Sequence, residues 1–474
     1  MFYSTKTNSS HKPKTKEVLD EMKRKVTRQE SRERLEKLSL AGELVKVIRK
    51  FFPDLMELLK GVRDPRNQSY ITYSNYVLMM TRILSAIFYI SSMRKSSQEL
   101  NFRMTIENIG QLCKEELEEL PYWETINQYL ERVEPEELQH VVNKLVYHLI
   151  RSRKFEGSRI RNKYWQVILD ATKLVGSKKE LDGNYIFFVH DKGKETQYTE
   201  YGYYVLEVKL VLSEDIVVSI MSEFIENKEE EYKKQDCERS AAARVMARLK
   251  EMYPHLPICI SGDSLYACES FFRRCEEYGW KFLCRFKGGS IPTVQTEYEA
   301  LKKLQNNEQH QSINGKDCVY DFVTEIDYNG VLLNYVYYSE KKSETKAKAG
   351  ESDNSLKTFT FLTDLPVNRN NVQDTVRCGR RRWLIENLGF NEQKKHGYYI
   401  EHLFSRNCCA MKNHYYLIQI AHMISQIMDA WKTLWTSINL SKEQKHKRIL
   451  DSWKTCSIAP FLSMDVTSFQ IRLE

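Results

Sequence analysis

The order of secondary-structure patterns between residues 164 and 286 constrains the fold of this chain most strongly. Apolar or alternating runs typical of strands occur at 165–170, 201–212, 216–225, 257–263 and 280–286. Helical spacing of apolar residues occurs at 236–252 and 266–278. Three strands, a helix, a strand, a helix and a strand predict a mixed α/β core.

The 474 residues allow two or three structural units around this core. We expect a basic helical arm at 1–60 with an unstructured start at 1–14, a helical domain at 61–158, the α/β domain at 159–435 and a C-terminal tail at 436–474. Residues 287–371 break the alternation of the core, and the turn signal Tyr328-Asn329-Gly330 predicts a hairpin there. We therefore expect a β-rich insertion at 287–371, with an exposed loop at 340–356.

The helical domain contains a candidate DNA-reading element. Pro121 breaks the helical pattern, and Thr125 is a suitable N-cap for a helix through Ile126, Tyr129, Leu130 and Val133. This arrangement fits a helix-turn-helix, although short helix pairs without DNA contact are common.

The positive charge of the chain is concentrated at its beginning. The net charge is +8, and residues 1–50 hold 14 Lys and Arg against 7 Asp and Glu. A basic arm on a nearly neutral body favours a polyanionic partner such as nucleic acid, although a solvated arm without a partner has the same composition. The most apolar stretch, 76–93, contains Arg82 and predicts a buried helix, not a membrane span. Eleven scattered cysteines without a Cys-x-x-Cys pair, and no signal peptide, favour a cytoplasmic location.

Two aspartates are predicted where buried strands meet loops. Asp170 ends the run Val-Ile-Leu, and Asp263 follows Ile-Cys-Ile-Ser-Gly. A single aspartate of this kind is most often a cap or turn residue. Two such strands in one sheet, however, would bring both carboxylates together, and a divalent cation would relieve their repulsion. Carboxylate oxygens favour Mg²⁺ or Mn²⁺.

A basic and acidic helix completes the candidate site. In Arg380-Arg381-Arg382-Trp383-Leu384-Ile385-Glu386, Arg382 and Glu386 are one helical turn apart. A surface ion pair is the simplest interpretation. The apolar residues 383–385 favour a partly buried helix, with Trp383 in the core and not stacked on a base. Arg380, Arg381, Arg382 and Lys394 are then candidate contacts to a phosphate backbone.

These residues resemble the DDE-type insertion-sequence transposases, specifically the insertion sequence four-like group with a β-rich insertion before the glutamate. The resemblance runs from about Gly61 to Asp429. It places the three acids of the family at Asp170, Asp263 and Glu386. The signature Tyr-x2-Arg-x3-Glu-x6-Lys is matched at Arg382 and Glu386, whereas Gly379 stands at the tyrosine position and Gln393 at the lysine position, one residue before Lys394.

The resemblance implies an RNase H-like catalytic core preceded by an all-helical N-terminal region. It further implies two Mg²⁺ or Mn²⁺ ions held by Asp170, Asp263 and Glu386, and phosphoryl transfer at DNA. Arg382 and Lys394 would hold the backbone of a transposon end. The implied partners are double-stranded DNA, as transposon ends and target, and a second copy of the chain in a synaptic complex at the nucleoid.

Other assignments remain open at this stage. Asp182 and Asp191 are expected to face solvent and Glu269 to have a surface role, whereas Glu392 and Glu401 are alternative third acids without an arginine four residues earlier. Cys378, His396, His402 and Cys408 have no zinc-finger spacing. The alternative functions are an RNase H-like nuclease or host-adopted transposase without strand transfer, and a non-enzymatic DNA-binding protein.

Overall fold

The computed structural model describes Glu33 and residues 38–227, 234–342, 356–436, 438 and 440–473. Most of the predicted basic arm, including 1–14, lies outside these residues, as does most of the predicted loop at 340–356. The described part of the arm forms α3 (Leu40–Phe51) and α4 (Leu55–Gly61), separated at Pro53 as the sequence indicates. The Ser39 hydroxyl caps α3 by accepting a hydrogen bond from the Gly42 amide.

The core sheet is mixed, as predicted. Its strands are β1 (Trp165–Ser177), β3 (Tyr198–Val211), β4 (Val217–Ile225), β5 (Ile258–Gly262) and β6 (Lys281–Phe286). Their order is β4-β3-β1-β5-β6. β1 runs antiparallel to β3 and parallel to β5, and β5 runs parallel to β6. The connecting helices α10 (Glu238–Met252) and α11 (Glu269–Tyr278) fall where helical spacing predicts them.

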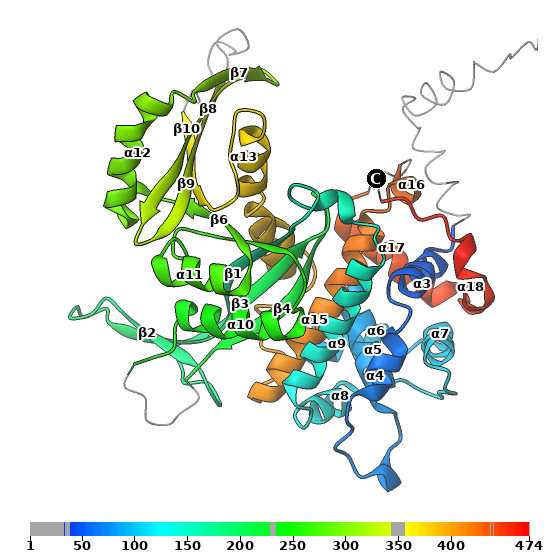
Figure 1. The fold of residues 1–474 in the computed structure, drawn as a ribbon. Helices are drawn as coiled ribbons and strands as arrows, with labels where there is room; N and C mark the ends of the chain where they lie inside the picture. The colour runs from blue at the N-terminus through cyan, green and yellow to red at the C-terminus, as the bar shows by residue number, and fades with distance from the viewer. Residues whose placement is uncertain are drawn as a thin grey trace, which may run out of the picture.

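Two strands differ from the prediction. β1 does not end at Asp170 but continues to Ser177, because β3 pairs with it along its whole second half. β2 (Ile186–His190) lies in a segment without a strand signal and pairs with the first half of β3. Together β2 and β3 form a ribbon that projects from the sheet (Figure 1). Asp170 therefore lies inside a strand. The pairing of β1 with β5 ends just before it, whereas the pairing of β1 with β3 continues past it.

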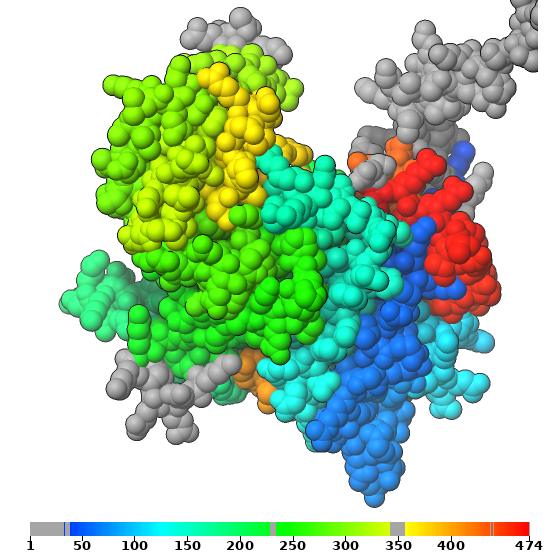
Figure 2. Space-filling view, viewed as in Figure 1, coloured from blue at the N-terminus to red at the C-terminus, as the bar shows by residue number. Residues whose placement is uncertain are grey.

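The insertion is joined to the core sheet. It contains the predicted strands β8 (Lys316–Tyr328), β9 (Val331–Lys342) and β10 (Lys357–Thr363), together with β7 (Gln309–Ile313) and the helix α12 (Pro292–Gln305). Asn329 and Gly330 form the predicted hairpin turn with φ of 53° and 80°. β10 pairs with β6, so the insertion extends the sheet into the upper lobe seen in Figures 1 and 2.

Helices from both ends of the chain cover one side of the core. The N-terminal set is α5 (Asn75–Ile87), α6 (Met93–Glu99), α7 (Arg103–Cys113), α8 (Trp123–Leu130) and α9 (Pro135–Arg151). α15 (Cys408–Asp429) packs against α5, α9 and β4, and is therefore surrounded by this set and the sheet (Figure 1). Its Asn413 amide donates to the carbonyls of Leu130 and Val133.

The predicted C-terminal tail is folded onto the first helices. It comprises α17 (Lys442–Thr455) and α18 (Ala459–Ser463), after the short α16 (Lys432–Trp435). α17 packs against α3 and α7, and its Trp453 side chain is fully buried. The two ends of the described chain therefore form one helical layer. None of the described helices is long and apolar enough to cross a membrane.

Thr125 is not the N-cap of the helix that was predicted as part of a helix-turn-helix. α8 begins at Trp123, whose amide donates to the Ser97 hydroxyl of α6, so Thr125 lies within the first turn. Ile126, Tyr129 and Leu130 are buried against neighbouring helices, as their spacing indicates. The exposed acids around α8 and the start of α9 are Glu124, Glu131, Glu134 and Glu136. Arg132 is also exposed there, but the net charge of this surface remains negative, which disfavours DNA contact through this helix pair.

Candidate active site

The register of β1 and β5 brings the two aspartates to one edge of the parallel sheet. The last paired residues of the two strands are Ile168 and Ser261. Asp170 and Asp263 each follow this pair by two residues, Asp170 within β1 and Asp263 one residue beyond the end of β5. Both aspartates therefore lie at the same end of the parallel pair. The predicted proximity of the two strand-end carboxylates thus follows from the hydrogen-bond register.

A broken helix places Glu386 against that edge. It consists of α13 (Val372–Arg380), a π-helix (Ile385–Asn391) and α14 (Glu392–Lys395). Ile385 and Phe390 of the π-helix pack on Ile168 of β1, which fixes the helix on the sheet. Arg382 Nη1 lies 2.7 Å from Glu386 Oε1 and 3.5 Å from Asp170 Oδ2. The predicted Arg382–Glu386 pair is therefore present, and it reaches the first aspartate.

The π-helix shifts the phase of the residues that follow Glu386 by one position. Residues seven apart face the same side of an α-helix, which has 3.6 residues per turn. A π-turn takes up one additional residue, so the equivalent position moves to eight residues after Glu386, which is Lys394. Gln393 is correspondingly turned inward and fully buried. Lys394 is partly exposed and pairs with Glu401 at 3.1 Å.

Gln393 belongs to a buried polar chain that fastens this helix to the core. Its Nε2 donates to Gln419 Oε1 of α15 at 2.8 Å, and the same oxygen accepts from Lys209 Nζ of β3 at 2.7 Å. Lys209 is fully buried and forms an ion pair with Glu207, the cross-strand partner of Asp170. A Cβ added at Gly389 of the π-helix would lie 3.4 Å from Lys209 Cε. The helix therefore rests directly on the lysine.

The electrostatics around Asp170 are those of a crowded acidic site. Burial raises the pKa of Asp170 to about 7, against the lowering effect of Arg382. The charges of Glu238, Glu386 and Asp263 raise it further. A neighbouring carboxylate raises a pKa in this way only when it lies close to the titrating group. Three carboxylates thus act on Asp170, and Arg382 offsets part of their repulsion.

Glu238 is the acid that the sequence did not reveal. It is the first residue of α10, and Tyr266 Oη donates to its Oε1 at 2.5 Å. Burial raises the pKa of Glu238, and Asp263 adds to the effect. Its position one residue after the N-cap Cys237 was the available signal. That signal was weak, because acids are common in the first turn of any helix.

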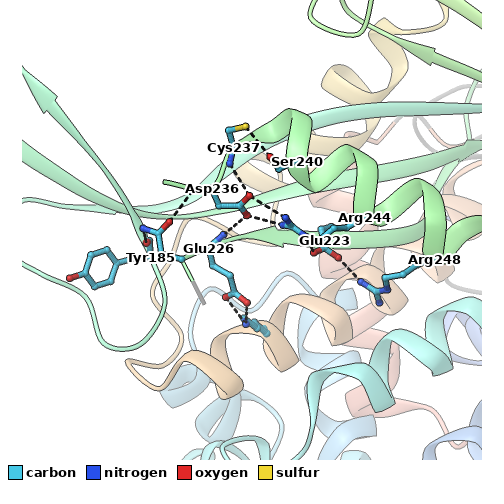
Figure 3. Close-up of polar contacts among 10 residues, drawn as sticks. Tyr185, Glu223, Glu226, Asp236, Cys237, Ser240, Arg244 and Arg248 are labelled. Atoms are coloured by element: carbon cyan, nitrogen blue, oxygen red, sulfur yellow. Dashed lines mark hydrogen bonds and ion pairs between the residues drawn. The ribbon is translucent and has the colours of Figure 1, made fainter. Parts of the chain in front are cut away.

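A network of ion pairs holds the start of α10 in place (Figure 3). The Arg244 guanidinium binds both oxygens of Asp236, at 3.1 and 2.7 Å, and also Glu223 of β4 at 2.6 Å. Arg248 reaches the second oxygen of Glu223 at 2.7 Å. Because Asp236 directly precedes the N-cap Cys237, these contacts fix the point at which Glu238 enters the site.

The pKa of Asp170 predicts a specific pH dependence for the metal-free protein. The folded chain keeps the proton on Asp170 up to about pH 7, whereas the unfolded chain releases it near its ordinary pKa of 3.8. Asp170 therefore lowers the free energy of unfolding by about 4 kcal/mol as pH rises from 4 to 7. We expect Asp170→Asn to remove this loss. Urea unfolding in EDTA at pH 5 and pH 8 measures it, and an equal drop in both proteins would contradict the assignment.

The other basic and aromatic residues differ in what they contact. Arg381 is buried, pairs with Glu214 at 2.6 Å and donates to the Ser158 carbonyl, which ties the helix to neighbouring loops. Arg380 is partly exposed and pairs with Glu340 of the insertion at 3.1 Å. The prediction of a core tryptophan is wrong: Trp383 is 48% exposed, because the helix buries Ile385 instead.

Gly379 lies so close to the insertion that a larger side chain would not fit. A Cβ at this position would lie 2.6 Å from the Phe361 ring of β10. The ring of Phe361, supplied by the insertion, therefore takes up the space next to the helix. Glycine at this position therefore allows the broken helix to pack closely against β10.

The remaining acids have separate surroundings. Asp182 and Asp191 are exposed, and Glu269 pairs with Arg273 on the surface of α11, all as expected. Glu392 is buried against His422 and Lys442. Asp263 Oδ1 accepts from the Leu265 amide at 2.8 Å, so its carboxylate also shapes its own turn.

The carboxylate oxygens of these acids are suitable ligands for divalent metal ions, but their present arrangement does not form a metal site. Within the described residues, no three Asp, Glu, His or Cys side chains converge closely enough to hold a metal ion. Arg382 lies between Asp170 and Glu386 in this state. The hard oxygen donors and their mutual repulsion suit Mg²⁺ or Mn²⁺, and movement of Arg382 toward an anionic substrate would free two of the acids.

Comparison with known proteins adds a distant structural likeness to this description. No family profile matches the sequence, and no curated protein is similar to it. The cryo-EM structure of a piggyBac transposase synaptic complex with hairpin DNA is similar over 93% of this chain and 84% of that chain. Its TM-score is 0.37 and its sequence identity 11%. Similarity at this level does not assign a fold family or a function to the chain.

Proposed function

We propose that the chain is a DDE-type DNA transposase with an RNase H-like core, which cuts and joins DNA strands with divalent metal ions. The observation that carries the proposal is the equivalent register of Asp170 and Asp263, together with the contact of Arg382 to both Asp170 and Glu386. The series of strands and helices that underlies the resemblance is also present. Carboxylates from three separate segments thus approach one basic surface.

Each acid has a distinct task in this proposal. The charges of both other acids act on Asp170, which would contribute to both metal positions, with Asp263 and Glu386 each completing one. Two bound ions would supply activation of the attacking hydroxyl and stabilisation of the leaving oxygen. Arg382 would exchange its carboxylate contacts for the substrate phosphate, which neutralises the backbone where the acids are exposed.

Arg382 and Lys394 are the residues that we propose for binding a transposon end. Both are on the broken helix, and the π-turn gives Lys394 the same phase as Glu386. Arg380 is accessible for the same role, whereas Arg381 is committed to Glu214. Excision and insertion of both ends would need two copies of the chain, so we propose a homodimeric synaptic complex. The predicted nucleoid location follows from this activity.

The test is cleavage of DNA that carries the ends of the element. Inverted repeats flanking the coding region, bounded by short direct duplications, would supply the substrate. We expect labelled ends to be nicked and joined to a target in Mg²⁺ or Mn²⁺, and to remain intact in EDTA. Cleavage without joining would favour the nuclease alternative. Tight DNA binding without any cleavage would favour the non-enzymatic protein.

A further inference from the structure

A basic pocket lies beside Asp263, between the core and the insertion. Its volume is about 230 Å³, and its wall contains four cationic side chains, Arg285, Lys287, Arg380 and Arg382, against the single acid Asp263. We call it the Arg285 pocket. It lies where β6 meets β10, so both the core strand and the insertion are needed to form it.

The positive charge of this pocket is only partly compensated. Arg380 pairs with Glu340, and Arg382 pairs with Glu386. Within the described residues, neither Arg285 nor Lys287 has a carboxylate within ion-pair distance. Two cations in the wall are therefore without a counter-charge, which favours an anion as ligand.

Arg285 is held rigidly and has a donor without an acceptor. Its Nη2 donates to the Thr358 carbonyl at 3.1 Å, and its guanidinium lies 4.7 Å from the centre of the Phe359 ring. Its Nη1 is buried and has no hydrogen-bond partner among the described residues. A buried N–H group without an acceptor is costly, and an anionic oxygen is the acceptor that guanidinium groups prefer.

We infer that the Arg285 pocket binds a backbone phosphate of a DNA strand, next to the phosphodiester that lies at the acids. The inference rests on the proposed function, and it adds Arg285 and Lys287 to the residues that hold the substrate. The pocket shares Asp263 and Arg382 with the acidic site, so one strand passes both. Its volume of about 230 Å³ is nearly eight times the roughly 30 Å³ that a water molecule occupies in the liquid, which admits a phosphate group.

The experiment measures binding of labelled oligonucleotides to the full chain by fluorescence anisotropy in EDTA. We expect Arg285→Gln and Lys287→Gln each to weaken DNA binding roughly tenfold. Each should also reduce the slope of log affinity against log salt concentration by about one, the value for one lost phosphate contact. The matched control is Arg103→Gln, because Arg103 is 94% exposed on α7, away from the pocket. It should bind like the unchanged protein. Lys287 is exposed, so its substitution leaves packing intact even if Arg285→Gln unfolds the chain.

The outcomes separate this inference from the proposed function. Cleavage by the unchanged protein, with unaltered oligonucleotide binding in both pocket variants, would overturn the pocket assignment and leave the transposase proposal standing. Absence of any DNA binding by the unchanged protein would overturn both. Inorganic phosphate is the second probe: if it binds only when Arg285 is present while oligonucleotide affinity is the same in all proteins, the pocket is a free-anion site and the strand assignment is wrong.

Discussion

Replacing Asp170 with asparagine is expected to reduce DNA cleavage at least about 10³-fold while leaving DNA binding intact. Asparagine keeps the size of the side chain but removes one of the carboxylates that would hold the metal ions. The charges of both Asp263 and Glu386 act on Asp170, so in the proposed reaction its loss would affect both metal positions. Single-turnover cleavage of a labelled end, with anisotropy for binding, measures the two effects separately.

The surrounding acids provide the controls for this experiment. The cleavage activity of Asp263→Asn and of Glu386→Gln should fall to a similar level, since each carboxylate would hold a metal ion in the proposed reaction. Glu269→Gln is the matched control, because Glu269 pairs with Arg273 on the surface of α11. It should retain full activity. Unchanged cleavage by Asp170→Asn would show that the acids are structural.

Replacing Gln393 with lysine is expected to destabilise the fold by about 3–5 kcal/mol, the cost of a buried charge without a partner. The family signature has lysine at this position, so sequence comparison alone would favour stronger DNA binding. Gln393 is instead fully buried and hydrogen-bonds Gln419, which already accepts from the Lys209 ammonium. A second ammonium group there would also repel Lys209. Chemical denaturation of the metal-free protein measures the change.

The neighbouring residue supplies the matched comparison. Lys394→Gln should change stability by no more than about 0.5 kcal/mol, because Lys394 pairs only with Glu401 near the surface. It should instead weaken binding to DNA ends. If Gln393→Lys were as stable as the unchanged protein and bound DNA more tightly, residue 393 would face the substrate, and the phase assigned to the π-helix would be wrong.

Periodic patterns made the core elements predictable. The helices α10 and α11 and the strands β5, β6, β8 and β9 were found because their hydrophobic period is set by local geometry. β2 was missed because its residues lie on an exposed ribbon, where Phe188 and Val189 remain accessible and no burial pattern arises. The length of β1 was underestimated for a related reason: pairing with β3 maintains it after its apolar run has ended.

The site was predictable in its residue types and only partly in its arrangement. The spacing of Arg382 and Glu386 specifies a contact within one helical turn, and that contact is present. Trp383 was misplaced because apolar character alone does not say which side of a helix faces the core. Glu238 and Arg285 were missed because each comes near the acids only when distant strands and helices pack together.

Local patterns in the sequence were sufficient to predict the order of strands and helices in the core and to identify the three candidate acids, because hydrophobic period and residue chemistry are local properties. The tertiary structure decided what no local pattern contains. The pairing of β1 with β5 aligned Asp170 with Asp263, and the junction of β10 with β6 formed the Arg285 pocket. The π-turn, held on Lys209, decided that Gln393 is buried and Lys394 faces outward. These are consequences of register and packing, which depend on contacts between residues far apart in the chain.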